Sequence, residues 1–192
     1  LREILALPDN IPDAVPVVGY LGSLGTWYLV EDMLRCFAHW RQKRPLVFLI
    51  LTGENPESVY EIAQKCGVLR DDLRVLSARR EDVPAYVKLM DVGLFFIQPC
   101  YAKQASSPTK LAEFLAAGKP VITLGGVGDL DTQLSGQPFA PVLSDTTESE
   151  YNRAFQALDG LFAVNPALPR AFAYAEYRLE WGVERYAAVY RG

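Results

Sequence analysis

Residue types that often build catalytic or metal centres are scarce in this sequence. It contains one histidine, His39, and three widely separated cysteines among its 192 residues. A single histidine makes a Ser-His-Asp triad or a histidine-rich metal site hard to build. Cys36, Cys66 and Cys100 match no zinc-binding spacing, and their odd number favours a reducing, cytoplasmic location. We therefore expect no metal site and no bound cofactor.

Long apolar runs and an excess of basic residues are also missing. No run reaches the roughly 18 apolar residues that a membrane-spanning helix needs, and no signal peptide is evident. The net charge is −4 at pH 7. Such a chain is poorly suited to bind nucleic acid or anionic lipid over a broad surface. We expect no nucleic-acid partner, and this part of the sequence does not indicate membrane association.

The first residues differ in composition from the rest. Residues 1–14 are rich in proline and show no clean period, as a linker would. The first residue is Leu1 rather than a methionine. We expect them to be the remnant of an interdomain linker in a piece of a larger protein. A processed mature chain is the alternative. Residues 15–192 are then expected to form one domain.

Apolar segments alternate with amphipathic ones along the rest of the chain. The pattern predicts strands at residues 16–21, 46–51, 73–76, 92–97, 120–124 and 140–143. It predicts helices at residues 27–41, 56–66, 83–90, 108–117, 149–162 and 168–190. Strands that are apolar on both faces need helices on both sides, so the predicted fold is α/β with a doubly wound parallel sheet. Ligands bind such sheets at the carboxyl ends of the strands.

The most informative segment is SSPTKLAEFLAAGKPV, residues 106–121. Ser107 is expected to be the N-cap of a helix, with Pro108 as its first residue. The first amides, near Thr109 and Lys110, then lack partners within the helix and can bind an anion. Lys110 adds a full positive charge at the same place.

Glu113 lies one turn further along this helix. It shares a face with Thr109, and small alanines flank that face, whereas Leu111, Phe114 and Leu115 lie on the opposite face. A carboxylate one turn past a phosphate site can accept hydrogen bonds from ribose hydroxyls. A capped surface helix with an incidental glutamate is the alternative, and geometry alone leaves both open.

Other candidate ligands follow the predicted strands. Gly22, Ser23 and Gly25 follow the first strand, where glycines let the backbone approach a ligand, although a simple tight turn is equally compatible. Arg79 follows the third strand, and Lys103 precedes the helix at residue 108. Either could contact a phosphate, and a solvated turn is the alternative for Arg79. Trp27 and Tyr28 could lie in the core or form the wall of a pocket, and the core is favoured. Asp91 lies at the opposite end of the sheet and is expected to be structural.

With these residues in hand, the chain resembles the C-terminal, nucleotide-sugar-binding domain of GT-B-fold glycosyltransferases, especially glycosyltransferase family four. The resemblance rests on SPTKLAEFLAAGKPV (107–121), on GYLGSLGTWY (19–28) and on GVERYAAVY (182–190). It implies a Rossmann-like domain in which Glu113 binds the donor ribose. The amides near Thr109 and Lys110 would hold the diphosphate, and the last helix would cross back toward an N-terminal domain.

The resemblance also implies an activity. This domain would be the donor-binding half of a retaining, metal-independent hexosyltransferase that takes a nucleoside diphosphate sugar as donor. Lys110 would stabilise the diphosphate leaving group. Since the acceptor site would belong to a missing N-terminal domain, this piece alone is expected to bind donor but transfer little.

Two departures from the family pattern keep other functions open. Ala105 stands where the family often has a second acidic residue, and the segment 26–32 lacks the arginine and lysine that neutralise the diphosphate in many members. Either Lys110, Lys103 or Arg79 substitutes for them, or the N-terminal half of the protein contributes the charge. A non-catalytic nucleotide-binding relative and a GT-B nucleotide-sugar epimerase are the alternatives. A Rossmann dehydrogenase fits less well, because no GxGxxG follows the first strand.

Overall fold

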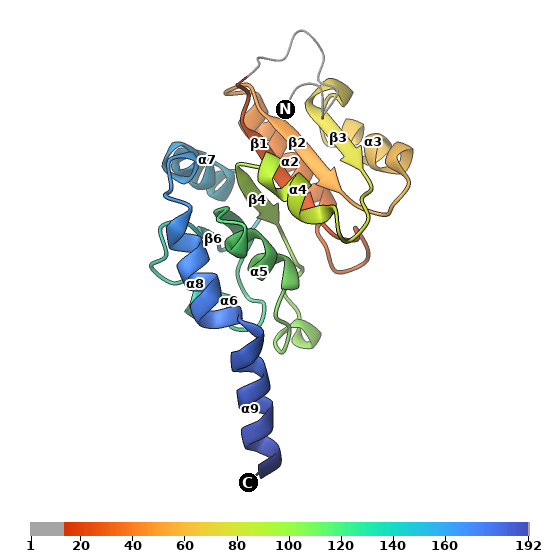
Figure 1. Ribbon diagram of the computed structural model, residues 1–192. Coiled ribbons are helices and arrows are strands. Elements are labelled where there is room, and N and C mark those ends of the chain that lie inside the picture. The colour runs from red at the N-terminus through yellow and green to blue at the C-terminus, as the bar shows by residue number, and fades with distance from the viewer. Residues whose placement is uncertain (1–13, 192) are drawn as a thin grey trace.

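A single six-stranded parallel sheet organises the chain. The computed structural model describes residues 14–191, so the linker expected at 1–14 lies almost wholly outside the described residues. The strands are β1 (Val17–Leu21), β2 (Val47–Leu51), β3 (Leu73–Leu76), β4 (Val92–Phe95), β5 (Val121–Leu124) and β6 (Val142–Leu143). Their order is β3-β2-β1-β4-β5-β6, which confirms the predicted doubly wound parallel sheet (Figure 1).

Helices cover both faces of this sheet. They are α2 (Val30–Arg41), α3 (Pro56–Lys65), α4 (Val83–Leu89), α5 (Thr109–Ala116), α6 (Leu130–Gln133), α7 (Glu148–Phe162), α8 (Ala167–Tyr177) and α9 (Leu179–Arg191). Two 3-10 turns, η1 (Arg70–Asp72) and η2 (Tyr101–Lys103), complete the elements. α2 packs against α3 and α7, while α5 packs against α8 on the other face (Figure 1). Every residue of β1, β2 and β4 is consequently buried.

Close packing on glycine fixes the position of α5. A Cβ atom on Gly93 of β4 would lie 2.7 Å from the Phe114 ring of α5, so only glycine lets this ring rest on the strand. Phe114 is fully buried there. At the other end of the helix, Gly118 follows the C-cap residue Ala117 with a φ of +78°, and its N–H donates to the Leu115 carbonyl, an arrangement typical of a helix C-terminus. This packing presents the N-terminus of α5 at the carboxyl edge of the sheet.

Asp91 is structural, as expected. Its backbone N–H donates to the Val17 carbonyl, and its Oδ2 accepts a hydrogen bond of 2.8 Å from the Val17 N–H. The two residues thus tie the start of β1 to the start of β4. This pair lies at the amino end of both strands, the end opposite to the expected ligand site.

Two helix predictions need correction, and one helix was not predicted. The single helix expected at 168–190 is wrong, because Arg178 adopts an extended conformation (φ −64°, ψ 143°) and divides it into α8 and α9. The helix expected at 27–41 begins only at Val30, since Tyr28 forms an antiparallel bridge with Ile97. The short helix α6 has no counterpart among the predicted elements.

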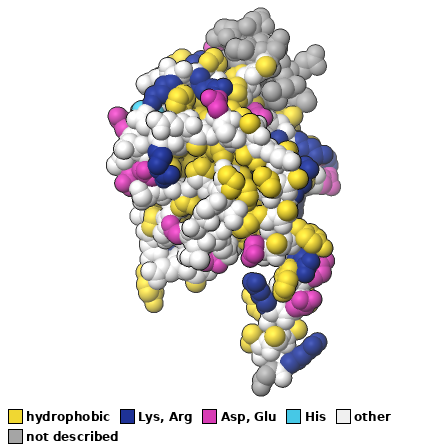
Figure 2. Space-filling view, turned by 90° about the vertical axis from the view of Figure 1, so that its left-hand side faces the viewer, with side chains coloured by type: hydrophobic (Ala, Val, Ile, Leu, Met, Phe, Trp, Pro, Cys, Tyr) yellow, Lys and Arg dark blue, Asp and Glu magenta, His cyan; other side chains and the backbone are white. Residues whose placement is uncertain are grey.

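α9 extends away from the body of the domain (Figure 1). None of its residues is buried in this chain. Figure 2 shows hydrophobic side chains exposed on this projecting segment, interspersed with basic and acidic ones. Its most exposed large apolar residues are Leu179, Val183, Tyr186, Val189 and Tyr190. Within residues 14–191, no helix combines the length and the apolarity needed to cross a bilayer.

Candidate functional site

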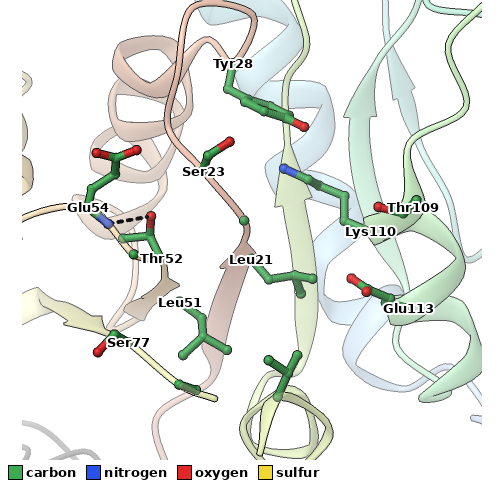
Figure 3. A pocket seen from close by; sticks show the side chains of 14 residues that line it. Leu21, Ser23, Tyr28, Leu51, Thr52, Glu54, Ser77, Thr109, Lys110 and Glu113 are labelled. Atoms are coloured by element: carbon green, nitrogen blue, oxygen red, sulfur yellow. Dashed lines mark hydrogen bonds between the residues drawn. The ribbon is translucent and has the colours of Figure 1, made fainter. Parts of the chain in front are cut away.

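A cavity of about 570 Å³ opens at the carboxyl edge of the sheet, between the ends of β1, β2 and β3 and the helix α5 (Figure 3). The cavity borders β1, which pairs with β2 on one side and β4 on the other, so the chain winds in opposite directions from this point. Such a switch point is where open α/β sheets bind ligands. The cavity is lined by Leu21, Gly22, Ser23, Tyr28, Leu51, Thr52, Gly53, Glu54, Ser77, Ala78, Val83, Thr109, Lys110 and Glu113.

The glycine loop after β1 forms one wall. Gly22 has a φ of +114°, a conformation that side-chain-bearing residues rarely adopt, and its N–H extends the sheet by donating to the Leu51 carbonyl. The loop returns to the sheet where the Leu29 N–H donates to the Phe96 carbonyl at 3.1 Å. Ser23 lies between these two attachments and borders the cavity. The loop is therefore held at both ends.

The helix α5 forms the facing wall, and its start differs from the prediction by one residue. Pro108 occupies the N-cap position, and the helix begins at Thr109, so Ser107 is not the N-cap. A proline N-cap provides no side-chain acceptor, and no side-chain cap bond forms. Within residues 14–191, no backbone hydrogen bond engages the N–H groups of Thr109 and Lys110. Both amides are thus available to an anion.

Lys110 is buried at this point, with only 4% of its surface exposed. Its Nζ donates to the Tyr20 hydroxyl at 2.8 Å and lies 4.1 Å and 3.6 Å from the ring centroids of Tyr20 and Tyr28. Loss of hydration lowers the pKa of Lys110 to about 7, while the nearby Glu113 carboxylate raises it in part. A negative ligand in the cavity would restore the favourable environment that burial removes.

Glu113 lies one turn beyond Lys110 and also faces the cavity (Figure 3). Its side chain is exposed, and no hydrogen bond or ion pair engages its carboxylate within the described part of the chain. A carboxylate offers only acceptor oxygens, so its complement is a ligand with hydroxyl or N–H donors. Amides and a cation at the helix start, followed by a carboxylate, therefore suit a ligand that carries an anion next to a polyol.

Several wall residues were not identified as candidates from the sequence. Thr52 and Glu54 follow β2, and Ser77 and Ala78 follow β3. The end of each predicted strand is the signal that finds them, because carboxyl ends of parallel strands share one edge. For Tyr28 the core was favoured over a pocket wall, but the residue is half-buried and lines the cavity. The favoured core position is also wrong for the neighbouring Trp27, whose surface is 43% exposed.

Four of the predicted ligands do not line the cavity: Gly25, Arg79, Lys103 and Ser107. The Arg79 guanidinium forms ion pairs with Glu81 at 2.8 Å and Asp82 at 2.9 Å. The Lys103 Nζ lies 4.9 Å from the centroid of the Trp27 ring. The assignment of these four residues to the donor stays a prediction.

Ala105 lies in the loop between η2 and α5, and it is exposed. This loop packs closely on the segment after β5: a Cβ atom on Gly128 would come within 2.0 Å of the Ser106 carbonyl oxygen, and Gly128 has a φ of +54°. The Gly128 N–H also donates to the Lys103 carbonyl. Glycine is needed at this contact, which holds the chain leading into α5.

Comparison with known proteins identifies the family to which this chain belongs. The model of the family described as Glycosyl transferases group 1 matches residues 15–138, more than half of the chain. The chain therefore belongs to this family of glycosyltransferases. The matched segment contains both the glycine loop and α5, which form the two walls of the cavity.

Individual proteins support the same class. TuaH of Bacillus subtilis (strain 168), named for a glycosyltransferase of teichuronic acid biosynthesis, is 48% identical over 42 residues, which are 22% of this chain and 11% of TuaH. S. aureus TarM, solved with UDP, superposes with a TM-score of 0.72 at 11% identity, covering 95% of this chain and 37% of TarM. The pneumococcal O-GlcNAc transferase GtfA, solved with UDP and GlcNAc, gives a TM-score of 0.66 at 14% identity, covering 96% of this chain and 37% of GtfA.

These similarities confirm the expected GT-B glycosyltransferase domain with a Rossmann-like sheet. The chain spans well under two thirds of each of these three proteins.

Proposed function

We propose that this domain is the donor-binding half of a glycosyltransferase and holds the nucleoside diphosphate of a sugar donor in the cavity beside α5. One observation carries the proposal: the amides of Thr109 and Lys110 and the Glu113 carboxylate, all without partners within residues 14–191, border one cavity together with the Lys110 ammonium. A nucleoside diphosphate carries an anion next to ribose hydroxyls, and these are the two kinds of group that the amides and the carboxylate can bind.

Each part of the donor has a wall to contact in this proposal. The diphosphate lies between the amides at the start of α5 and the loop at Gly22 and Ser23, and the ribose hydroxyls donate to Glu113. The wall formed by Ser77 and Ala78 is then left for the base. Because the TarM and GtfA structures contain UDP, uridine diphosphate is the first nucleotide to test.

The chemistry follows from the charges that surround the leaving group. As the bond from the sugar to the diphosphate breaks, negative charge grows on the diphosphate, and fixed amides together with Lys110 stabilise it. In our proposal this supplies the electrostatic stabilisation without a divalent metal. Transfer of a hexose with retention of anomeric configuration is part of the same proposal, as is a cytoplasmic location, which the free cysteines favour.

The acceptor site belongs to an N-terminal domain in this proposal. The projecting helix α9, with exposed Val183, Tyr186 and Val189, offers an apolar surface for that domain. We therefore expect the 192-residue chain to bind the nucleotide but to transfer sugar only when it is joined to its N-terminal part.

Isothermal titration calorimetry of this chain with UDP, GDP and ADP tests the donor site. We expect at least one nucleotide to bind, with a Kd between about 1 μM and 1 mM. The Glu113→Ala substitution should weaken this binding about 5- to 150-fold, which corresponds to the loss of about 1–3 kcal/mol. Glu61→Ala, which removes an exposed glutamate from α3, is the matched control.

Two results would contradict the proposal. If a correctly folded chain binds none of the three nucleotides, the cavity is not a donor site. If Glu113→Ala binds as tightly as Glu61→Ala, Glu113 is a surface residue with no role in ribose binding. Addition of EDTA should leave the affinity unchanged if no divalent metal takes part.

A non-catalytic nucleotide-binding relative is the second candidate. Ala105 favours it, because the carboxylate that many family members place near the donor sugar is missing there. Turnover of a labelled nucleotide sugar by the full-length protein separates the two candidates. Binding without turnover or donor hydrolysis would support the non-catalytic function.

A further inference from the structure

Tyr20 carries a buried hydroxyl at the end of β1, directly behind the cavity wall. The strand is otherwise apolar, and no part of Tyr20 is exposed. Its Oη donates to the Ser23 carbonyl at 2.5 Å and accepts from the Lys110 Nζ at 2.8 Å. Two segments that lie about 90 residues apart in the sequence therefore meet at one phenol oxygen.

The direction of these two bonds is determined by chemistry. A phenol has one proton to donate, and a protonated lysine can only donate. Burial raises the pKa of Tyr20, as do the charges of Tyr28 and Glu54, so the phenol keeps its proton at neutral pH. That proton goes to Ser23, and the oxygen lone pairs accept from Lys110. The loop, the phenol and the ammonium form one continuous chain of hydrogen bonds.

The spacing shows how closely the loop and the lysine are associated. A Cβ atom on Gly22 would lie 3.2 Å from the Lys110 Nζ, so the loop backbone passes directly over the ammonium. Tyr20 accounts for only one of the three N–H donors of Lys110, and no other hydrogen bond of this ammonium is found within residues 14–191. Lys110 lines the cavity, so a bound anion can engage the remaining donors there.

We propose that Tyr20 is a positioning residue, whose hydroxyl holds the Ser23 backbone and the Lys110 ammonium at one spacing so that both meet the same phosphate group. The inference deepens the proposed function and rests on it. It assigns a role to a hydroxyl that packing alone does not require, because the ring of Tyr20 already makes an edge-to-face contact with Tyr28. Phenylalanine would keep that contact and lose only the hydrogen bonds.

A pH profile can distinguish this role from simple packing. The groups that face Lys110 are Tyr20 from β1, Tyr28 from the loop, Glu54 across the cavity and Glu113 on its own helix. With a pKa of about 7 in the free chain, Lys110 takes up a proton when an anion binds, so affinity falls as pH rises above 7. Loss of the phenol oxygen removes an acceptor from the ammonium and moves this fall to lower pH.

The experiment measures UDP binding by the native chain and by Tyr20→Phe between pH 6.5 and 9, with folding checked by circular dichroism. We expect Tyr20→Phe to bind UDP about 5- to 20-fold more weakly than the native chain at pH 7.5. As pH rises, the affinity of Tyr20→Phe should begin to fall at a lower pH than that of the native chain. Tyr151→Phe is the matched control: Tyr151 is also buried and donates to a backbone carbonyl, that of Asp32, at a distance from the cavity. It should leave UDP affinity and its pH profile unchanged.

Native-chain calorimetry provides a second test should Tyr20→Phe fail to fold. Titrations with UDP at pH 7.5 in two buffers of different ionisation enthalpy should show net proton uptake, and none should remain in Lys110→Met. Equal affinity and an equal pH profile for Tyr20→Phe and the native chain would overturn the role of Tyr20, as would the absence of proton uptake. A native chain that binds no nucleotide would instead overturn the proposed function itself.

Discussion

The Nζ of Lys110 lies 3.6 Å from the centre of the Tyr28 ring, inside a wall of the cavity rather than on the protein surface. The ring face attracts the ammonium, but a contact of this kind contributes only about 0.5–2 kcal/mol. Burial of the charge costs more, as the lowered pKa of about 7 indicates. In the free chain, Lys110 therefore opposes folding, and a bound anion would offset this cost.

The Lys110→Met substitution should stabilise the free chain and weaken nucleotide binding. Methionine has a similar length and no charge, so we expect the free energy of unfolding to rise by about 1–3 kcal/mol at pH 6.5. The unfolded chain keeps the lysine proton up to about pH 10.5, whereas the folded chain loses it near pH 7. Native stability therefore rises with pH through this window, and the advantage of Lys110→Met should shrink by pH 9.

Urea denaturation of both chains at pH 6.5 and pH 9 measures this difference, since all other titrating groups are shared. A variant that is less stable than the native chain at both pH values would mean that the aromatic contacts outweigh the cost of burial. An advantage that grows from pH 6.5 to pH 9 would contradict the direction of the pKa shift.

Gly22→Ala should damage both the fold and the site. The residue has a φ of +114°, and its new Cβ would meet the Lys110 Nζ at 3.2 Å. We expect a loss of about 1–3 kcal/mol in unfolding free energy and weaker UDP binding by the folded chain. Gly25→Ala is the matched control for stability, because no atom lies within 4 Å of its Cβ position and its φ is not positive. If Gly22→Ala and Gly25→Ala unfold at the same temperature in a thermal denaturation experiment, this prediction is wrong.

The strands could be predicted because their positions depend on a local property. Parallel strands covered on both faces are largely apolar, so the six strands appear in the sequence as short, mostly apolar segments, with Arg74 in β3 and Thr123 in β5 as polar exceptions. Helix ends were less predictable, because distant contacts determine them. Tyr28 is an example. It forms a bridge with Ile97, nearly 70 positions away in the sequence, so α2 begins at Val30 instead of at the predicted residue 27.

The candidate site was predictable in its location but not in its environment. The carboxyl ends of the strands and the start of α5 follow from fold class and capping pattern, so Gly22, Thr109 and Glu113 could be placed in advance. The burial of Lys110 could not, because it depends on Tyr20 and Tyr28, which join it only through tertiary packing. A lysine at the second position of a helix is ordinarily solvated, and nothing in its immediate sequence indicates the aromatic pair.

Asp91→Ala should destabilise the chain without affecting nucleotide binding. The substitution leaves the Val17 N–H without its 2.8 Å acceptor at the start of β1, which we expect to cost about 1–3 kcal/mol. Asp91→Asn retains a side-chain carbonyl and should recover most of this stability. Chemical denaturation measures the loss, and calorimetry with UDP measures the binding. A change in the Kd of the folded variant would show that the amino end of the sheet influences the cavity.

Arg79→Ala should change UDP affinity less than about 2-fold. The guanidinium is directed to Glu81 and Asp82 and is not part of the cavity wall, so its charge is already compensated at a solvated turn. Arg35→Ala serves as the control for loss of one exposed positive charge, because Arg35 is paired with Glu31 on α2. If Arg79→Ala weakens binding as much as Glu113→Ala does, the turn after β3 must rearrange when the nucleotide binds, and Arg79 must exchange its carboxylate partners for the donor.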